Sequence, residues 1–221
     1  MFRNRPFVTS NGFRQSSAFI VVGLAGSHGL FHAFDQSLVV MLPEIKDAFA
    51  LSAVGVGLIA ATERAADGLI SAPAGIATDM YRRYWGIVLA ACMALFGLGW
   101  LMVGAAPVFP LLLVGIAMVA VASSIWHLPA MAALSHRFPA KRGTVLSLHS
   151  VGGNIGDVIG PLLTTAIFLS FLTWRGVLGV YAIVPLALVL VVFWAFRRIG
   201  ETHDQESMVT LRGQIELTKN L

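Results

Sequence analysis

Two histidines and an aspartate lie close together in an otherwise apolar stretch near the start of the chain. His28 and His32 are four residues apart, so on a helix they share one face, and Asp35 follows within the next turn. Imidazole and carboxylate groups in apolar surroundings are suited to binding and releasing a proton, or to holding a substrate. A structural hydrogen-bonding network between helices is the alternative interpretation of the same residues.

A second ionisable group, Glu63, Arg64 and Asp67, lies in the next apolar stretch. In two antiparallel helices, residues equally far from the shared connection lie at the same depth, at about 1.5 Å of rise per residue. This places His32 level with Glu63, and His28 level with Asp67. We predict the histidines and carboxylates as candidates for proton coupling or substrate binding, and Arg64 as a structural counter-ion.

The composition indicates that these groups lie in a membrane. Of the 221 residues, 57% are hydrophobic and 12% are charged, and the mean hydropathy is +0.80, whereas soluble domains carry roughly 25% charged residues. The single cysteine, Cys92, excludes a disulfide scaffold, and the apolar content excludes a disordered chain. The net charge of +4 does not indicate nucleic-acid binding, because the basic residues form short groups between apolar runs.

Six apolar stretches are long enough to cross a bilayer as helices, which takes about 20 residues each. They fall at roughly 18–42, 53–76, 86–106, 108–133, 144–170 and 174–196. We therefore predict an all-α membrane protein with a six-helix transmembrane domain over 18–198. A cytoplasmic segment, 1–17, precedes it, and a polar cytoplasmic tail, 199–221, follows.

The distribution of basic residues predicts the orientation of these helices. Twelve of the 15 lysines and arginines fall on the side of the two termini, and only Lys46 and Arg175 fall on the opposite side. Basic residues concentrate on the cytoplasmic side of membrane proteins, so both termini are expected in the cytoplasm.

The fifth stretch combines a glycine repeat with a carboxylate. Gly152, Gly156 and Gly160 recur every four residues and leave a helix face without side chains, on which another helix can approach closely. Pro161 removes a backbone donor and favours a kink. Asp157 lies deep in the same stretch, where it either titrates or makes a structural hydrogen bond.

Two more histidines lie at comparable depth in the fourth and fifth stretches. His127 follows Trp126, which we interpret as a packing aromatic, and His149 begins the glycine-rich segment. These histidines are a pH-sensitive pair, a metal site or two unrelated buried residues, and the sequence leaves these alternatives open.

The connection after the second stretch reads GIATDMYRR. Its Gly75, Asp79 and Arg83 resemble the signature loop of the major facilitator superfamily, in which a glycine, three residues and an aspartate precede basic residues. Met80 and Arg82 depart from that pattern, since an arginine and a glycine are usual there. The segments HAFDQSLVVMLPEI, SSIWHLPAM and GGNIGDVIGP look like the fosmidomycin-resistance type of drug exporter within the superfamily.

The resemblance implies a transporter built from two six-helix halves that hold a substrate between them and rock to give alternating access. Such exporters commonly use the proton gradient. By resemblance, Asp79 and Arg83 belong to a cytoplasmic gating network, and the carboxylates of the first, second and fifth helices are coupling sites. The chain resembles an N-terminal half, so a second six-helix half or a homodimer is the expected partner.

We therefore expect half of a proton-coupled exporter in a bacterial inner membrane, acting on a drug-like or small anionic or amphipathic substrate. No enzymatic activity is expected, because no serine or cysteine nucleophile has an evident base at matching depth. We also expect no cofactor, no metal and no nucleic-acid partner. The first alternative is a truncated, non-transporting membrane module that associates with or regulates another membrane protein. The second is a membrane metal or haem protein using four histidines: His28, His32, His127 and His149.

Overall fold

The computed structural model describes residues 10–201. Most of the two predicted cytoplasmic segments, 1–9 and 202–221, therefore lies outside the described residues. The described chain is helical and contains no strand between residues 10 and 201. Its six long helices are α2 (Ser17–Ala48), α3 (Ala53–Met80), α4 (Trp85–Ala105), α5 (Phe109–Arg137), α6 (Arg142–Leu163) and α8 (Trp174–Phe196).

Short elements connect the long helices. They are α1 (Ser10–Arg14), the 3₁₀ turns η1 (Arg82–Tyr84) and η2 (Pro139–Lys141), the π-helix η3 (Thr164–Phe168) and α7 (Leu169–Phe171). Each predicted apolar stretch contains a long helix or most of one, but the stretch predicted at 144–170 divides into α6, η3 and α7. The helices α2 and α5 continue beyond their predicted ends, at 42 and 133. The apolar runs stop at those positions, but each helix continues through a further turn that contains polar residues.

Five of the helical segments are long and apolar enough to cross a membrane, namely those containing α2, α4, α5, α6 and α8. The exception is α3, which is 28 residues long. Every 18-residue stretch of α3 contains all of Glu63, Arg64 and Asp67, and this charge lowers its apolar character. The helix expected to carry part of the functional site thus has three charged residues near its middle.

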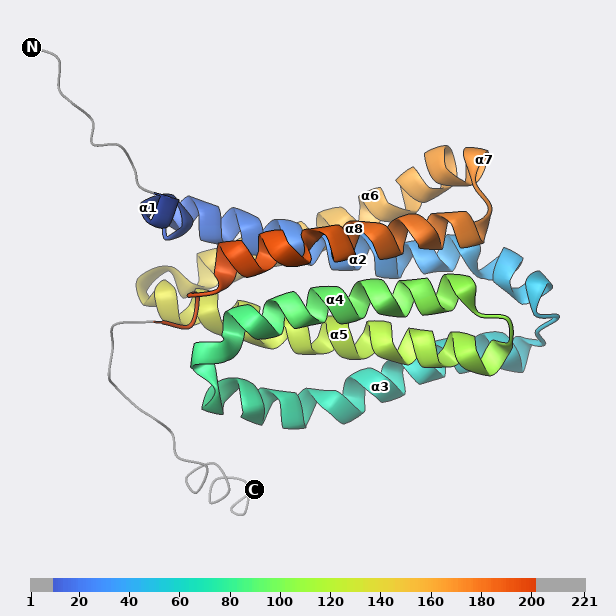
Figure 1. The fold of residues 1–221 in the computed structure, drawn as a ribbon, viewed down its shortest axis with the longest axis horizontal. Coiled ribbons are helices and arrows are strands. Elements are labelled where there is room, and N and C mark those ends of the chain that lie inside the picture. The colour runs from blue at the N-terminus through green and yellow to red at the C-terminus, as the bar shows by residue number, and fades with distance from the viewer. Residues whose placement is uncertain (1–9, 202–221) are drawn as a thin grey trace, which may run out of the picture.

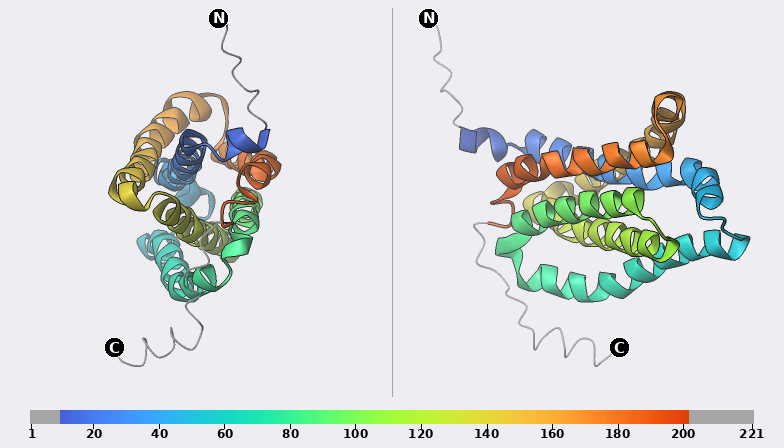
Figure 2. Two further views of the ribbon diagram at one scale, coloured as in Figure 1. Left: turned by 90° about the vertical axis from the view of Figure 1, so that its left-hand side faces the viewer. Right: turned by 45° about the vertical axis from the view of Figure 1, so that its right-hand side comes forward.

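The long helices form a bundle in which they run side by side along the longest axis (Figures 1 and 2). The closest pairs are α2 with α6, α4 with α5 and α8, and α3 with α5. Helix α3 lies at the edge of the bundle and buries only Ile59, Ala74 and Thr78. The other residues of α3 are partly or fully exposed on the surface of the bundle.

The contact between α2 and α6 is a contact between backbones. A Cβ atom added at Gly29 of α2 would lie 2.7 Å from the carbonyl oxygen of Gly152 in α6. A Cβ atom added at Gly156 or Gly160 would collide with the backbone of Gly29 or Ala33. The glycine repeat of the fifth stretch therefore packs on a matching row of small residues in α2.

The end of α6 departs from regular geometry after Pro161. This proline lies inside α6, and the π-helix η3 begins three residues later. A π-turn is one way in which a helix accommodates the donor that a proline removes. In Figure 1, the segment from η3 to α7 leans away from α8, although the Thr164 hydroxyl still makes a hydrogen bond with that of Tyr181 in α8.

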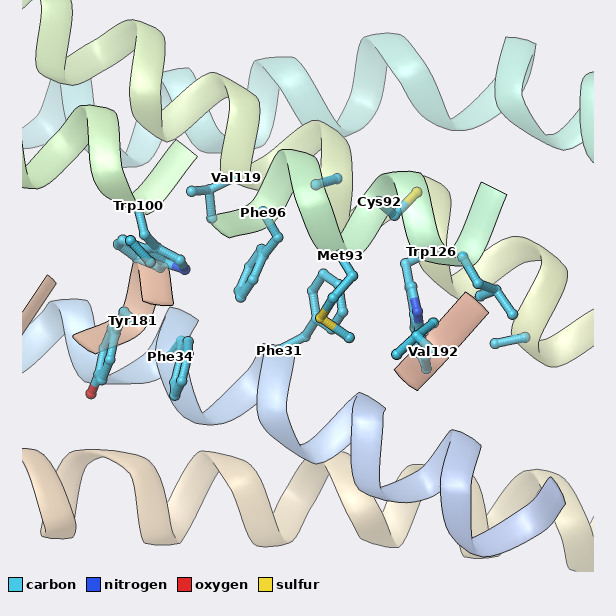
Figure 3. Close-up of a cluster of buried hydrophobic side chains, with 14 of the residues drawn as sticks. Phe31, Phe34, Cys92, Met93, Phe96, Trp100, Val119, Trp126, Tyr181 and Val192 are labelled. Atoms are coloured by element: carbon cyan, nitrogen blue, oxygen red, sulfur yellow. The ribbon is translucent and has the colours of Figure 1, made fainter. Parts of the chain in front are cut away.

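An aromatic core joins α2 to α4, α5 and α8 (Figure 3). The rings of Phe34 and Tyr181 are stacked with centroids 4.0 Å apart, and Phe31 packs on Trp126 at 5.1 Å. Phe31, Trp126 and Tyr181 are at most 1% exposed. Because aromatic pairs of this kind fix the rotation of the helices that carry them, the core orients the polar face of α2 toward α3 and α5.

Candidate functional site

A cavity of about 220 Å³ lies among α2, α3, α4 and α5. Trp100, Ile116 and Val119 contribute to its apolar wall. Its polar wall comes from α2, α3 and α5, and consists of His32, Asp35, Gln36, Glu63, Arg64, Asp67, Ser123, Ser124 and His127. The cavity thus brings together five of the ionisable residues that we singled out in the first two helices.

Asp35 is the most enclosed carboxylate of this wall. Its Oδ2 atom accepts a hydrogen bond from the Ser123 hydroxyl at 3.3 Å, which links α2 to α5. Its Oδ1 atom is buried and has no hydrogen-bond partner among the described residues. A buried polar atom without a partner is costly, so native structures rarely keep one without a functional reason.

The α3 side of the cavity carries opposite charges. Arg64 and Glu63 form an ion pair at 3.7 Å, in which their side chains are 78% and 41% exposed. The hydroxyl of Ser71 donates to the backbone carbonyl of Asp67 at 2.7 Å and lies 3.1 Å from the hydroxyl of Ser124 in α5. Arg64, which we predicted as a structural counter-ion, therefore contacts Glu63 through a loose and exposed ion pair.

The two histidines of α2 interact with α6. His32 Nδ1 lies 2.8 Å from Asp157 Oδ1, and His28 Nδ1 lies 2.8 Å from the backbone oxygen of His149. Depth along the helices set His28 level with Asp67, but His28, unlike Asp67, does not line the cavity shared with α3. The close approach of α6 explains the difference, since it brings acceptors of α6 within reach of both rings.

A third histidine, His127 of α5, joins this pair. Its ring centroid lies 4.7 Å from that of His28 and 5.8 Å from that of His32. His149 stacks flat on His28, with centroids 4.1 Å apart and an interplanar angle of 4°. Trp126 is fully buried and stacks near His149 at 5.9 Å, as expected for a packing aromatic.

The signature segment lies at one end of the bundle. Gly75 and Asp79 belong to the last turns of α3, which continues to Met80, so the segment that we predicted as a connection is largely helical. Arg83 lies in η1, where its guanidinium is 4.6 Å from the ring centroid of Tyr84. The Trp85 indole donates to the backbone oxygen of Thr78 at 2.8 Å and fixes this turn.

Several lining residues were not predicted as site residues. Ser123 and Ser124 make hydrogen bonds to other helices, and only Ile125 separates them from Trp126 and His127 in the segment SSIWHLPAM. Two adjacent hydroxyl residues in an apolar helix were the available signal. Trp100 carried no such signal, because its place in the wall depends on the rotation of α4.

Five helical segments with the length and composition of membrane spans, of which α2, α4 and α5 line a cavity that contains carboxylates, define an integral, multi-pass membrane protein with a polar site. Residues 24–214 match the sequence model of the Major Facilitator Superfamily. The chain belongs to this superfamily of membrane transporters, as the resemblance of its signature segment indicated.

Two curated relatives support this assignment. The chain is 29% identical over 173 residues to the fosmidomycin resistance protein of Escherichia coli, a match that covers 75% of this chain and 42% of that protein. It is 24% identical over 184 residues to an uncharacterised MFS-type transporter of Bacillus subtilis, covering 82% of this chain and 44% of that protein. The matched part of the chain thus spans less than half the length of either relative.

Proposed function

We propose that this chain forms one half of a proton-coupled transporter of small molecules, and that the cavity among α2, α3, α4 and α5 is its site. The observation that carries the proposal is the position of Asp35, which lies in α2 against the cavity and has one buried oxygen without a hydrogen-bond partner in the described structure. A carboxylate placed in this way is suited to alternate between charged and protonated forms during a transport cycle.

The charges around Asp35 support this role. Glu63 and Asp67 line the same cavity, and Arg64 is the one permanent cation among its described lining residues. When all four groups are ionised, the three carboxylates and the one guanidinium give the cavity wall a net negative charge. A proton or a cationic group can neutralise this charge. We propose that Asp35 carries the coupled proton, that Glu63 and Asp67 assist it, and that Arg64 offers a site for an anionic substrate group.

The exposed surface of α3 supports the proposal that this chain has a membrane-embedded partner. Arg64 lies about 17 Å along a helix of about 42 Å, and its side chain is 78% exposed in this chain alone. A guanidinium facing hydrocarbon is costly. We therefore propose that α3 is the sixth span, and that its exposed side meets a second six-helix half or a second copy of the chain.

The ends of the bundle complete the proposal. With both termini in the cytoplasm, as the basic residues favour, Asp79 and Arg83 lie on the cytoplasmic side. We propose that they belong to a gate that opens and closes as the two halves rock. The proposed location is the inner membrane of a bacterium.

The name of the Escherichia coli relative makes fosmidomycin the first candidate substrate. The test is expression of the chain in a fosmidomycin-sensitive bacterium, with the inhibitory concentration as the readout. The native chain should raise that concentration, and Asp35→Asn should abolish the gain at an equal amount of membrane-inserted protein. Glu44→Gln is the matched control, since Glu44 lies on the same helix and is exposed, outside the cavity.

Two results would count against the proposal. Full resistance in the Asp35→Asn variant would show that Asp35 does not carry the coupled proton. If the native chain gave no resistance at verified expression, this substrate would be excluded for the chain acting as a homo-oligomer.

A further inference from the structure

Three histidines from two helices converge beside the cavity. One ring nitrogen from each of His28, His32 and His127 lies within 4.8 Å of the others. The ring of His28 meets the other two edge to face, with centroids 4.4 Å from His32 and 4.7 Å from His127. Two of the three, His32 and His127, also line the cavity.

Each of the three rings is held at Nδ1 by an oxygen acceptor. His28 Nδ1 lies 2.8 Å from the backbone oxygen of His149, and His127 Nδ1 lies 2.5 Å from that of Ser123. A backbone carbonyl only accepts hydrogen bonds, so the Nδ1 atoms of His28 and His127 carry the proton and donate it.

The third ring follows the same pattern. His32 Nδ1 lies 2.8 Å from the carboxylate oxygen of Asp157, and a carboxylate likewise accepts this bond. In the neutral form of each ring, the proton on Nδ1 leaves Nε2 with a free lone pair. Each of the three rings therefore keeps one lone pair, on Nε2, that is free to bind a metal ion.

We propose that His28, His32 and His127 bind a late first-row transition-metal dication, of which Zn²⁺ is the type, through their Nε2 atoms. Neutral imidazole suits zinc, cobalt, nickel and copper, whereas magnesium and calcium require oxygen ligands. Metal-binding histidines characteristically donate their second nitrogen to a carboxylate or a backbone carbonyl, and all three rings have this arrangement.

The surroundings fit a metal with one exchangeable ligand. Three histidines leave a fourth position of a tetrahedral site open, and the cavity that His32 and His127 line gives access to it. Asp157 supplies negative charge next to the site, and Asp35 supplies more in the adjoining cavity wall. A purely structural network explains the three Nδ1 contacts, but it does not explain why one ring nitrogen of each histidine lies within 4.8 Å of the others.

Cobalt is the probe that tests the site, since Co²⁺ bound by histidines in a four-coordinate site gives visible absorption bands. The native 221-residue chain, purified in detergent with a tag that contains no histidine and freed of metal by a chelator, is titrated with Co²⁺. We expect one Co²⁺ per chain, displacement by one equivalent of Zn²⁺, and no displacement by Mg²⁺.

Variants then assign the ligands. His32→Ala and His127→Ala should each remove the bands, and Asp157→Asn should weaken Co²⁺ binding by about 10–100-fold, as loss of an outer-shell carboxylate does. His136→Ala is the matched control, because His136 lies on the same helix as His127 and is exposed. It should leave binding unchanged.

The native titration decides the proposal even where a variant fails to fold. Absence of stoichiometric Co²⁺ binding by the native chain would overturn it, as would unchanged binding in both His32→Ala and His127→Ala. The site does not rest on the transport proposal, since metal binding is measured in detergent without any transported compound.

Discussion

The backbone contact between α2 and α6 gives the sharpest test of the fold, through two glycines of α2 that are three residues apart. A Cβ atom added at Gly29 would lie 2.7 Å from the carbonyl oxygen of Gly152, whereas a Cβ atom added at Gly26 would have no neighbour within 4 Å. The obstacle at Gly29 is backbone, so Gly29→Ala can be accommodated only if the two helices move apart. Gly26→Ala requires no movement.

The expected magnitudes follow from these distances. Overpacking a close contact costs about 1–3 kcal/mol, so Gly29→Ala should lower the free energy of unfolding by that amount. Alanine is favoured over glycine inside a helix by about 0.8–1.0 kcal/mol, so Gly26→Ala should leave the stability unchanged or raise it slightly. The two variants should therefore differ by about 1–4 kcal/mol.

Unfolding of the purified chain in mixed micelles, followed by circular dichroism as denaturing detergent is added, measures this difference. Each variant acts as the control for the other, because both place one methyl group on the same helix. If the two free energies of unfolding agree within about 0.5 kcal/mol, the helices do not meet at Gly29. The positions of His28 and His32 relative to α6 would then need revision as well.

Three further predictions follow from the described contacts. Tyr181→Phe removes the hydrogen bond with Thr164 and should lower the free energy of unfolding by about 0.5–1.5 kcal/mol, measured in the same micelles. Cys92 is 4% exposed, so a maleimide should label it only once the chain unfolds, and rapid labelling of the native chain would contradict its packing. In a Cys92→Ala background, Lys46→Cys should react with an impermeant maleimide added outside cells, and Lys141→Cys only after permeabilisation. The reverse pattern would refute the cytoplasmic placement of the termini.

The helices were predictable from the sequence because each needs about 20 apolar residues to cross a bilayer, and the chain contains six separate runs of that length. The small-residue face of α6 was predictable for a similar reason, since a glycine every fourth residue leaves one side of a helix bare. The helix that packs on this face was not predictable, because nothing local to α6 selects α2 as its neighbour.

The partners of individual side chains were harder to predict than the helices. Depth along two antiparallel helices set His28 level with Asp67, but depth does not determine the direction in which a ring points. That direction depends on the rotation of α2, which the packing of Phe31 and Phe34 on α4, α5 and α8 fixes (Figure 3). His28 consequently meets α6 and His127.

Proton movement through the assembled protein tests the central claim most directly. Vesicles containing the native chain and its partner half, or two copies of the chain, are loaded with a pH-sensitive dye, and a transported compound is added outside. Proton-coupled transport predicts a change in luminal pH that depends on the compound and disappears in the Asp35→Asn variant, while Glu44→Gln retains it. An equal change in luminal pH with Asp35→Asn would contradict the assignment of Asp35 as the carrier of the coupled proton.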